Sequence, residues 1–436
     1  MELNNKKIIN AWCMFDWANS VYSLVITVAI FPAFYEKMTF KAFHGNIVNF
    51  LGLEIPNTVL YGYSLSFSFL LLSFLLPILS GIADIGGNKK PFMRFFTILG
   101  SLSCIGLFWF DGANIVWGIT CFFLASLGFG GSIVFYNAYL PEIASPDQYD
   151  AVSAKGFSLG YFGSVLLLLL NLLMAIKPEL FGFDTTDTTA FSVRISFVLV
   201  GLWWFGFSQI TFYYLPNHRK QVDKTINIFV QGFAQLKSVL QAVSKQPFTL
   251  RFLLGFFFYN AGVQTVLYLA TLFASKELQM TQDKLIVTIL ILQIVAIAGA
   301  AVFAKVSEKQ GNKFTILIIL SVWIVDCICA YFVTTDTHFY LLAAGVGIVM
   351  GGIQSLSRAT YCKLFPENTT DTASYFSLYD VLDKFSTFFG TFAYTYIEQI
   401  TGSMRNSIFA LSLFFIIGFV FIATIQIKAA KKEVVA

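Results

Sequence analysis

Two loops of this chain carry the same short pattern. Residues 81–90 read GIADIGGNKK, and residues 303–313 read FAKVSEKQGNK. The Gly-Asn-Lys triplets that they share lie about half of the 436-residue chain apart. Each loop stands between two long apolar segments. The repeat therefore predicts a chain made of two similar halves, each with a polar loop after its second apolar segment.

The composition places these halves in a membrane. The chain is 57% hydrophobic and only 12% charged, with a mean hydropathy of +0.73, whereas a soluble domain is about 25% charged. A helix that crosses the bilayer needs about 20 apolar residues. Runs of that length predict an all-α membrane protein with twelve transmembrane helices in two six-helix halves, at residues 9–36, 59–83, 91–111, 113–140, 155–177, 190–215, 248–274, 283–304, 314–334, 338–363, 374–399 and 404–428.

The longest polar stretch separates the sixth of these segments from the seventh. We expect an N-terminal six-helix half over residues 1–215, a cytoplasmic linker over 216–247 and a C-terminal six-helix half over 248–436. Within the linker, apolar residues from Ile226 to Leu240 recur at helical spacing with lysines opposite. That pattern predicts an amphipathic helix lying on the membrane surface. No small-residue cleavage site follows Lys6 and Lys7, so the first segment is expected to remain as a helix.

The distribution of basic residues predicts the orientation. With both termini in the cytoplasm, about 21 of the 28 lysines and arginines fall on the cytoplasmic side. We therefore expect a multi-pass protein of the inner, cytoplasmic membrane, embedded in the lipid bilayer as a monomer. The six cysteines are scattered, and the sequence has neither a phosphate-binding loop nor an HExxH motif. These features argue against an enzyme, a metal site, a cofactor and a nucleic-acid partner.

The first loop resembles the signature of the major facilitator superfamily, Gly-x-x-x-Asp-x-x-Gly-x-Lys/Arg, with Asp84 and Lys89 in the places of the acid and the base. Other stretches resemble the family of vacuolar amino-acid effluxers associated with autophagy and its bacterial relatives. They are FDWANSVYSLVI from residue 15, YNAYLPEIA from 136, SAKGFSLGY from 153, FYNAGVQTV from 258, GGIQSLSR from 351 and YFSLYDVLDKF from 375. Relatives carry an acid where this chain has Ala261, so no charged role is expected there.

The resemblance implies a transporter whose two halves rock about a site at mid-membrane. We expect secondary transport of a small polar organic solute, with amino acids as the class that the family suggests and with coupling to protons left open. The alternative solutes are a peptide, a sugar fragment or a lysolipid, and the alternative function is a non-transporting membrane sensor. No ATP site is visible in the sequence, so a gradient of an ion or of the solute would drive transport.

Asp16 lies inside the first apolar segment. At helical spacing Asp16, Asn19 and Ser23 share one face of the expected helix, and lipid cannot satisfy such a polar stripe. We therefore predict that this face lines the transport path, with Asp16 as the proton carrier or as a contact of the solute. The alternative is a structural ion pair or hydrogen bond between helices.

The eleventh segment carries Asp380 and Lys384, an i,i+4 pair with the acid first, and Asp383 at the edge of the same face. The superfamily arrangement places this helix beside the cavity, so Lys384 is a candidate counter-ion for Asp16 or for a carboxylate of the solute. The alternative is a pair closed between Asp380 and Lys384. Further residues predicted to line the path are Tyr136, Asn137, Asn260, Gln264 and Gln354.

Arg358 lies near the cytoplasmic end of the tenth segment. A guanidinium group can hold a carboxylate with two hydrogen bonds. Arg358 would therefore either bind a carboxylate of the solute or close a cytoplasmic gate by pairing with an acid of the other half.

The repeated loops predict the rest of that gate. Asp84 can accept hydrogen bonds from the amides at the start of the eleventh segment, where the helix dipole is positive. Lys89 and Lys90 can hold acids nearby, and Glu308 and Lys313 take the matching positions in the second half. The sequence suggests no role for Asp326 in the ninth segment.

Overall fold

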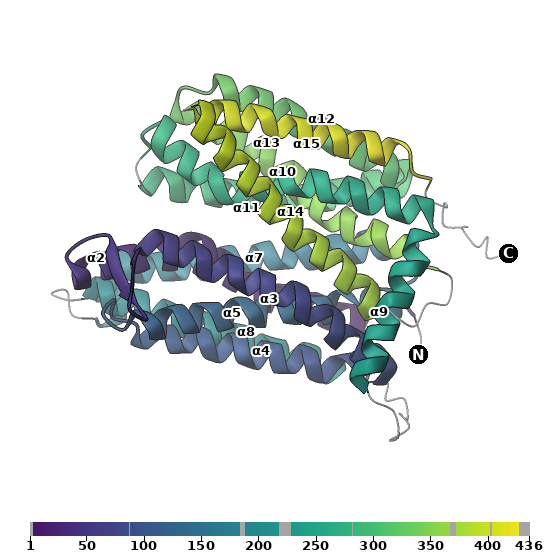
Figure 1. The fold of residues 1–436 in the computed structure, drawn as a ribbon, viewed down its shortest axis with the longest axis horizontal. Coiled ribbons are helices and arrows are strands. Elements are labelled where there is room, and N and C mark those ends of the chain that lie inside the picture. Colours follow the sequence, from purple (N-terminus) through teal and green to yellow (C-terminus); the bar gives the residue numbers. More distant parts are fainter. Residues whose placement is uncertain are drawn as a thin grey trace.

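The computed structural model describes residues 3–86, 88–183, 188–217, 228–280, 282–366, 372–401 and 403–426. Within these ranges the chain forms long helices that run side by side, together with one small hairpin (Figure 1). Ten of the helices are long and apolar enough to cross a membrane, or eleven when residues 6–29 and 31–43, which meet at a bend of 43°, count as one span. The remaining long helix, α14 (Thr372–Thr401), is more polar because it carries Asp380, Asp383 and Lys384.

The first half begins with α1 (Lys6–Val21), which continues as the π-helix η1 (Tyr22–Ala29) and bends into α2 (Phe31–Phe43). Pro32, in the first turn of α2, has no backbone N–H to continue the preceding ladder, and this accounts for the bend. An antiparallel hairpin of β1 (Ile47–Phe50) and β2 (Leu53–Pro56) follows. The other elements of this half are α3 (Asn57–Gly86), α4 (Lys89–Gly106), η2 (Leu107–Trp109), α5 (Ile115–Asn137), α6 (Leu140–Ile143), α7 (Tyr149–Ile176), η3 (Pro178–Phe181) and α8 (Thr188–Tyr214).

The second half follows the connecting helix α9 (Ile228–Ser244). Its long helices are α10 (Pro247–Glu277), α11 (Gln282–Gln310), α12 (Asn312–Phe332), α13 (Asp336–Lys363), α14 and α15 (Met404–Ala423).

The two halves repeat one packing scheme. In the first half α1 packs against α7 and α8, and α4 packs against α5 and α8. In the second half α10 packs against α14 and α15, and α12 packs against α13 and α15. The pairs α3–α5 and α11–α13 also correspond. The predicted all-α membrane fold of two similar six-helix halves is therefore confirmed.

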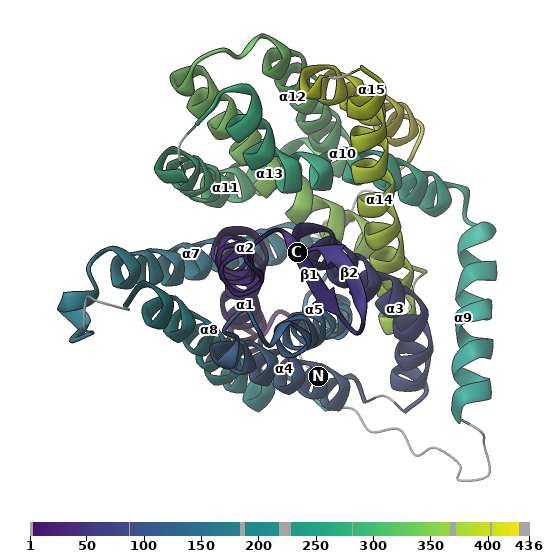
Figure 2. The same ribbon diagram turned by 60° about the vertical axis from the view of Figure 1, so that its left-hand side comes forward.

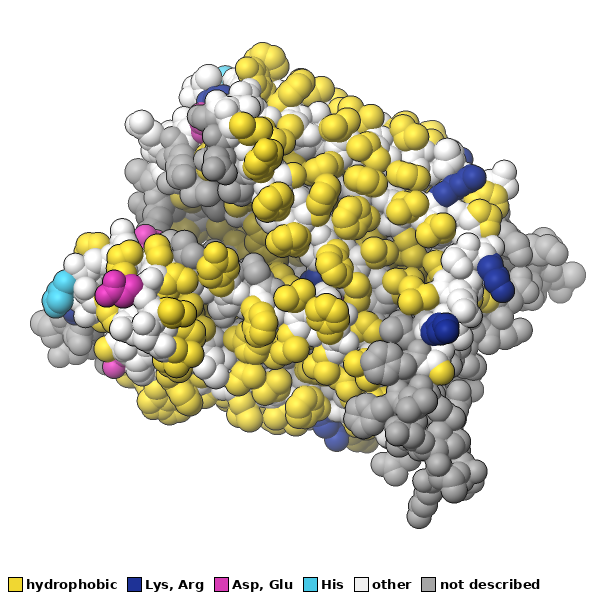
Figure 3. Space-filling model, viewed as in Figure 1, with side chains coloured by type: hydrophobic (Ala, Val, Ile, Leu, Met, Phe, Trp, Pro, Cys, Tyr) yellow, Lys and Arg dark blue, Asp and Glu magenta, His cyan; other side chains and the backbone are white. Residues whose placement is uncertain are grey.

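The halves meet mainly at one end of the molecule. Between them, α3 packs against α14, and α7 packs against α11 and α13. Figure 1 shows the two bundles splayed apart at the end that carries α2 and the hairpin, and joined at the end that α9 crosses. We call these the hairpin end and the α9 end. Figure 2 shows the hairpin over the end of the first half, beside α2 and α3, and Figure 3 shows the surface hollowed between the halves at the hairpin end.

Glycines allow close packing within the second half. A Cβ on Gly351 would lie 2.1 Å from the carbonyl oxygen of Ala296, and one on Gly347 would lie 2.6 Å from that of Leu292. Any side chain at these positions of α13 would push α11 away. Small residues that let two backbones approach are a general device of membrane helices.

The connecting helix lies across the α9 end and contacts both halves, through α3 on one side and α10 and α14 on the other. Its buried side chains Val239 and Val243 face the protein, whereas Leu240 is 45% exposed. The predicted amphipathic helix is thus present, but this part of its apolar face packs on the bundle rather than on lipid. Ile226, where the predicted pattern begins, lies outside the described residues.

The outside of the bundle is apolar where lipid would contact it. Phe74 of α3, Phe388 of α14 and Leu413 of α15 are each more than half exposed. Figure 3 shows hydrophobic side chains across the middle of this face, with most charged side chains toward its two ends. Such a surface suits a multi-pass membrane protein, because only satisfied helical backbones and apolar side chains are stable against hydrocarbon.

Candidate functional site

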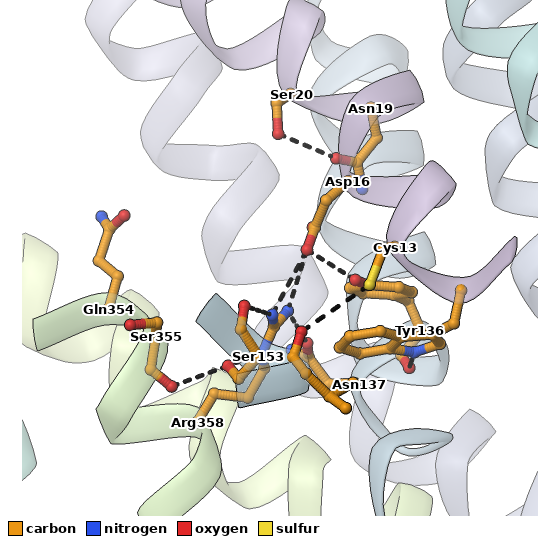
Figure 4. A network of polar contacts seen from close by, with 12 residues as sticks. Cys13, Asp16, Asn19, Ser20, Tyr136, Asn137, Ser153, Gln354, Ser355 and Arg358 are labelled. Carbon is orange, nitrogen blue, oxygen red and sulfur yellow. Dashed lines mark hydrogen bonds and ion pairs between the residues drawn. The ribbon is translucent and has the colours of Figure 1, made fainter. Parts of the chain in front are cut away.

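Arg358 of α13 reaches from the second half into the first. Its Nη1 and Nη2 atoms each lie 3.4 Å from Oδ2 of Asp16 on α1. Tyr136 of α5 donates a hydrogen bond of 2.6 Å to the same oxygen. All three side chains are buried, so water screens this ion pair little. Figure 4 shows the guanidinium group enclosed by residues of the opposite half.

The other nitrogen contacts of Arg358 also come from the first half. Its Nε donates to Ser153 Oγ at 2.9 Å, its Nη2 to the Ser153 carbonyl oxygen at 3.0 Å, and its Nη1 to Asn137 Oδ1 at 3.3 Å. The rings of Trp12 and Phe157 lie 4.8 and 4.3 Å from its Cζ, close enough for cation–π attraction. We call Arg358, Asp16, Tyr136, Asn137 and Ser153 the arginine junction.

Gly156 makes room for this junction. A Cβ on Gly156 would lie 2.5 Å from Oδ2 of Asp16 and 3.1 Å from Nη2 of Arg358. Because α7 presents only a hydrogen atom at this position, the acid and the arginine can meet beside its backbone.

Three other predicted residues lie outside the junction. Asn19 is buried on α1 and accepts a hydrogen bond from Ser20 at 3.5 Å. Ser23 is half-buried in η1, farther toward the hairpin end. Gln354 accepts a hydrogen bond from Tyr161 of α7, which is another contact between the halves. Figure 4 shows Asn19 and Gln354 away from the guanidinium group.

A second polar cluster is centred on Asp383 of α14. Lys384 Nζ lies 2.6 Å from Asp383 Oδ2, and Asn260 and Gln264 of α10 donate to Asp383 Oδ1 at 2.8 and 3.2 Å. The predictions that Lys384 pairs with Asp16 or with Asp380 are therefore wrong in this state. Asn260 and Gln264 hold Asp383 in place, and the flexible lysine side chain folds onto it. Lys384 also lies over the ring of Phe69 on α3, 5.1 Å from its centre.

Asp380 lies one turn before Lys384 on α14. It is 6% exposed, and within the described residues its Oδ2 atom is buried without a hydrogen-bond partner. A buried carboxylate without a partner is costly inside a membrane.

Asp84 makes the contact that the sequence predicts. Its carboxylate accepts from the backbone amides of Ala373 at 3.2 Å and Ser374 at 2.8 Å, in the first turn of α14. Lys89 lies 3.5 Å from Asp84 and also pairs with Glu142. We call these residues the first junction. Among the described residues Lys90 pairs with no acid, and it donates to the carbonyl oxygen of Leu215 at 2.6 Å.

The matching contact of the second half uses other residues than predicted. Ser307 and Asn312 donate to Asp150 of α7 at 2.8 and 2.7 Å, and Lys363 of α13 forms an ion pair with the same acid at 2.8 Å. We call these four residues the second junction. The prediction that Glu308 and Lys313 make this contact is wrong. Glu308 follows Ser307 and Lys313 follows Asn312, so each side chain points away from the buried face of its helix: Glu308 is exposed and Lys313 is only half-buried.

Asp326 borders a cavity inside the second half. The cavity measures about 60 Å³ and is lined by residues of α10 to α15, mostly apolar. Oδ2 of Asp326 is buried without a hydrogen-bond partner in the described part of the chain. The lining residues belong to the second half alone, so this cavity is separate from the surface between the halves.

Sequence reasoning missed several residues that join the halves. Ser153, Asp150, Ser307, Asn312 and Lys363 were not predicted. Asp150 carries one usable signal, since it lies in the first turn of α7, where an acid is favoured by the helix dipole. The partners of Asp150, which are Ser307, Asn312 and Lys363, carry no such signal, because their roles depend on a helix of the other half.

The sequence of the chain matches a known family over nearly its whole length. The family model described as "Vacuole effluxer Atg22 like" matches residues 4–435. The chain belongs to the Atg22-like family. It is a transporter of the major facilitator superfamily and not an enzyme, as the motifs predict.

Curated relatives cover most of the chain. An uncharacterised transporter of the major facilitator type, YxiO of Bacillus subtilis, is 29% identical over 415 residues, which are 95% of this chain and 94% of that protein. Autophagy-related protein 22 of Pichia angusta is 26% identical over 409 residues, covering 81% of this chain and 72% of the relative.

Solved structures share the fold at low sequence identity. The proton:xylose symporter XylE matches with a TM-score of 0.72 at 13% identity, covering 96% of this chain and 95% of that one. The human organic anion transporter MFSD10 matches with a TM-score of 0.69 at 11% identity, covering 97% and 100%. The transporter FucP in its outward conformation matches with a TM-score of 0.68 at 12% identity, covering 95% and 97%.

Proposed function

We propose that the chain is a secondary active transporter that moves a small polar organic solute, with amino acids as the class, by alternating access between its halves. The observation that carries the proposal is the arginine junction, in which one buried guanidinium of the second half is held by an acid, an amide and a hydroxyl of the first. Rigid halves can make and break such a contact as they rotate, which alternating access requires.

We place the α9 end in the cytoplasm of a cell whose inner membrane holds the chain. Lys6, Lys7, Lys89 and Lys90 stand at the ends of helices on this side, and an excess of basic residues is typical of cytoplasmic loops. The first and second junctions then close the cytoplasmic side, and the recess at the hairpin end faces outward. On this proposal the structure represents an outward-facing state.

The proposal of amino acids rests on the charges beside the path as well as on the family. An amino acid presents a carboxylate and an ammonium group, and the surfaces between the halves offer both complements, in Arg358 and Lys384 and in Asp16 and Asp383. Asn260, Gln264 and Asn137 add amide groups that can donate or accept. A purely apolar lipid path would have no use for these residues.

A counterflow experiment tests the function. The purified protein is reconstituted in liposomes loaded with a mixed pool of amino acids, and uptake of the same radiolabelled pool from outside is measured. We expect exchange by the wild type and its loss in Arg358→Ala. Arg251→Ala is the matched control, because Arg251 is an exposed arginine of α10 that donates to the carbonyl oxygen of Thr424, just after α15, and it should exchange normally.

The same liposomes distinguish the alternatives. Exchange of a dipeptide or sugar pool without exchange of amino acids would show that the solute is a peptide or a sugar and not an amino acid. Failure of every pool, with protein that is folded and correctly inserted, would contradict transport and favour a membrane sensor.

A further inference from the structure

The charges between the halves do not balance. Apart from the first and second junctions, the described helices bring three carboxylates and two cations to the buried surfaces beside the path. Asp16 pairs with Arg358, and Asp383 pairs with Lys384. The remaining acid is Asp380, whose Oδ2 atom is buried without a partner.

An unpaired carboxylate at this depth is unstable. Insertion of a charged acid at the centre of a membrane helix costs about 2.5–3.5 kcal/mol. A proton removes that cost, and it needs no more space than Asp380 has, whereas the side chain is too enclosed, at 6% exposure, to receive an ammonium group of a solute. The geometry therefore favours a neutral, protonated Asp380 in this state.

The two cations in the surroundings of Asp380 are each paired with another acid. The charged groups that act on Asp380 are Lys384 and Asp383 of its own helix and Arg358 of α13. Tyr361, one turn after Arg358 on α13, stacks on Tyr379, the neighbour of Asp380, with 5.2 Å between ring centres, so the two residues lie on helices that touch at this level. In this state Arg358 is directed to Asp16 of the other half.

The other helices packed on α14 place their charges farther away. α3 brings Asp84 to the first turn of α14, about 9 Å along the helix from Asp380 at 1.5 Å per residue. α10 and α15 carry Arg251, Glu277 and Arg405 near their ends, α5 carries no charged residue, and the described lysine of α9, Lys237, is exposed. Tyr379 precedes Asp380 on α14, and Tyr361 of α13 stacks on it.

We propose that Asp380 and Arg358 form a proton switch, in which Arg358 exchanges Asp16 for Asp380 as the α9 end opens. While the arginine junction is closed, Asp380 has no free cation and holds a proton taken from water at the hairpin end. When the halves part at the α9 end, Asp16 stays with the first half and Arg358 stays with Asp380 in the second. The guanidinium then pairs with the carboxylate, and the Asp380 proton leaves to water at the α9 end.

The switch rests on the proposed function, since it supplies the coupling of that transport cycle. It assigns the proton to Asp380 rather than to Asp16, which the sequence favoured as the proton carrier. Oδ2 of Asp16 is held by Arg358 and Tyr136 here, so a proton on this acid would weaken the junction. One proton would move per cycle from the hairpin side to the α9 side, for either direction of the solute.

Infrared spectroscopy of the purified protein tests the switch without a solute. All variants carry Asp326→Asn, because Asp326, which borders the cavity inside the second half, shares with Asp380 an Oδ2 atom that is buried without a hydrogen-bond partner among the described residues. At neutral pH this parent protein should show the band of a protonated carboxyl group, and Asp380→Asn should abolish it. Asp16→Asn frees Arg358 and should also abolish the band, although Asp380 is still present.

Two outcomes would overturn the switch. A parent protein without an Asp380 band would show that this acid is ionised, and a band that persists in folded Asp16→Asn protein would show that Arg358 does not control it. Should Asp16→Asn fail to fold, Ser153→Ala removes an acceptor that holds Arg358 in the first half, and a reduced band is expected there; an unchanged band would count against the switch.

A transport experiment separates this inference from the proposed function. In liposomes, Asp380→Asn should retain counterflow of the amino-acid pool and lose accumulation driven by a pH gradient, while Asp326→Asn retains both. Wild-type pH-driven accumulation by Asp380→Asn would contradict the switch. If the wild type moves no amino acids at all, the proposal of amino acids as the solute is wrong. The infrared bands still show whether Asp380 is protonated and whether Arg358 controls it.

Discussion

Asp150 and Lys363 form an ion pair across the halves, with 2.8 Å between Oδ2 and Nζ. In this second junction the acid stands at the start of α7, and Ser307 and Asn312 near the repeated loop act as donors. In the first junction the roles are exchanged, because Asp84 supplies the acid and the start of α14 supplies backbone donors. Both arrangements tie the start of a helix in one half to a loop of the other.

Breaking the first junction should open the α9 end to water. Asp84→Ala leaves two amides of α14 without an acceptor, and hydrogen bonds to a charged group are worth about 1.5–3 kcal/mol each. The open population should rise about tenfold or more, since each 1.4 kcal/mol is a factor of about ten. The native Cys13 and Cys362 are buried beside the arginine junction and serve as reporters. Their rate of reaction with a water-soluble maleimide should increase accordingly.

Two further cysteines provide the control. Cys104 and Cys121 are buried in the separate core of the first half, and their reaction should not change. Asp150→Asn should raise the labelling of the same two reporters through the second junction. Labelling of Cys13 and Cys362 at the wild-type rate in both variants would show that the junctions do not hold the α9 end closed.

Gly156 offers a test of the arginine junction that leaves its charges intact. In Gly156→Ala the new Cβ would lie 2.5 Å from Oδ2 of Asp16, so either the ion pair or the approach of α7 must yield. We expect faster labelling of Cys13 and a lower rate of pool exchange. Gly206→Ala is the matched control, because a Cβ there meets nothing within 4 Å. Equal behaviour of the two variants would mean that α7 adapts without disturbing Asp16.

The helices could be predicted from the sequence because lipid imposes a simple rule on each of them. Every long apolar run except the first became one long helix, and the repeated loops revealed the two halves. α14 shows the limit of that rule, since its polar face lowers its hydropathy although it is as long as the others. The bend between η1 and α2 also required the structure, because the first apolar run continues through it.

The partners of the site residues were harder to predict than the residues. Asp16, Tyr136, Asn137 and Arg358 were all expected beside the path, and the structure brings them together. Their pairing depends on the rotation of α13 against α1, which no local pattern contains. Asp84 was the exception, because a helix start is an anion site whatever its sequence.

A double-mutant cycle measures the arginine junction. Asp16→Asn leaves Arg358 buried without its acid, and Arg358→Met leaves Asp16 buried without its cation. Loss of one member of a buried pair typically costs about 3–5 kcal/mol, so each single variant should unfold at a clearly lower temperature in detergent. The double variant should be more stable than the sum of the single changes predicts, and strictly additive losses would show that the two residues do not interact.

Lys384 provides the sharpest test of the second polar cluster. Lys384→Met removes the cation from Asp383, whose other oxygen is held by Asn260 and Gln264, and leaves that acid charged inside the membrane. We expect poor yield of folded protein and a loss of stability of about 3–5 kcal/mol, as for other broken buried pairs. Adding Asp383→Asn should restore monodisperse protein, because an asparagine keeps the shape and can still meet the two amides. Asp16→Asn and Asp380→Asn, the partners that the sequence suggested, should not rescue it. Rescue by Asp380→Asn in place of Asp383→Asn would mean that Lys384 neutralises Asp380. The charge count that leaves Asp380 unpaired would then be wrong.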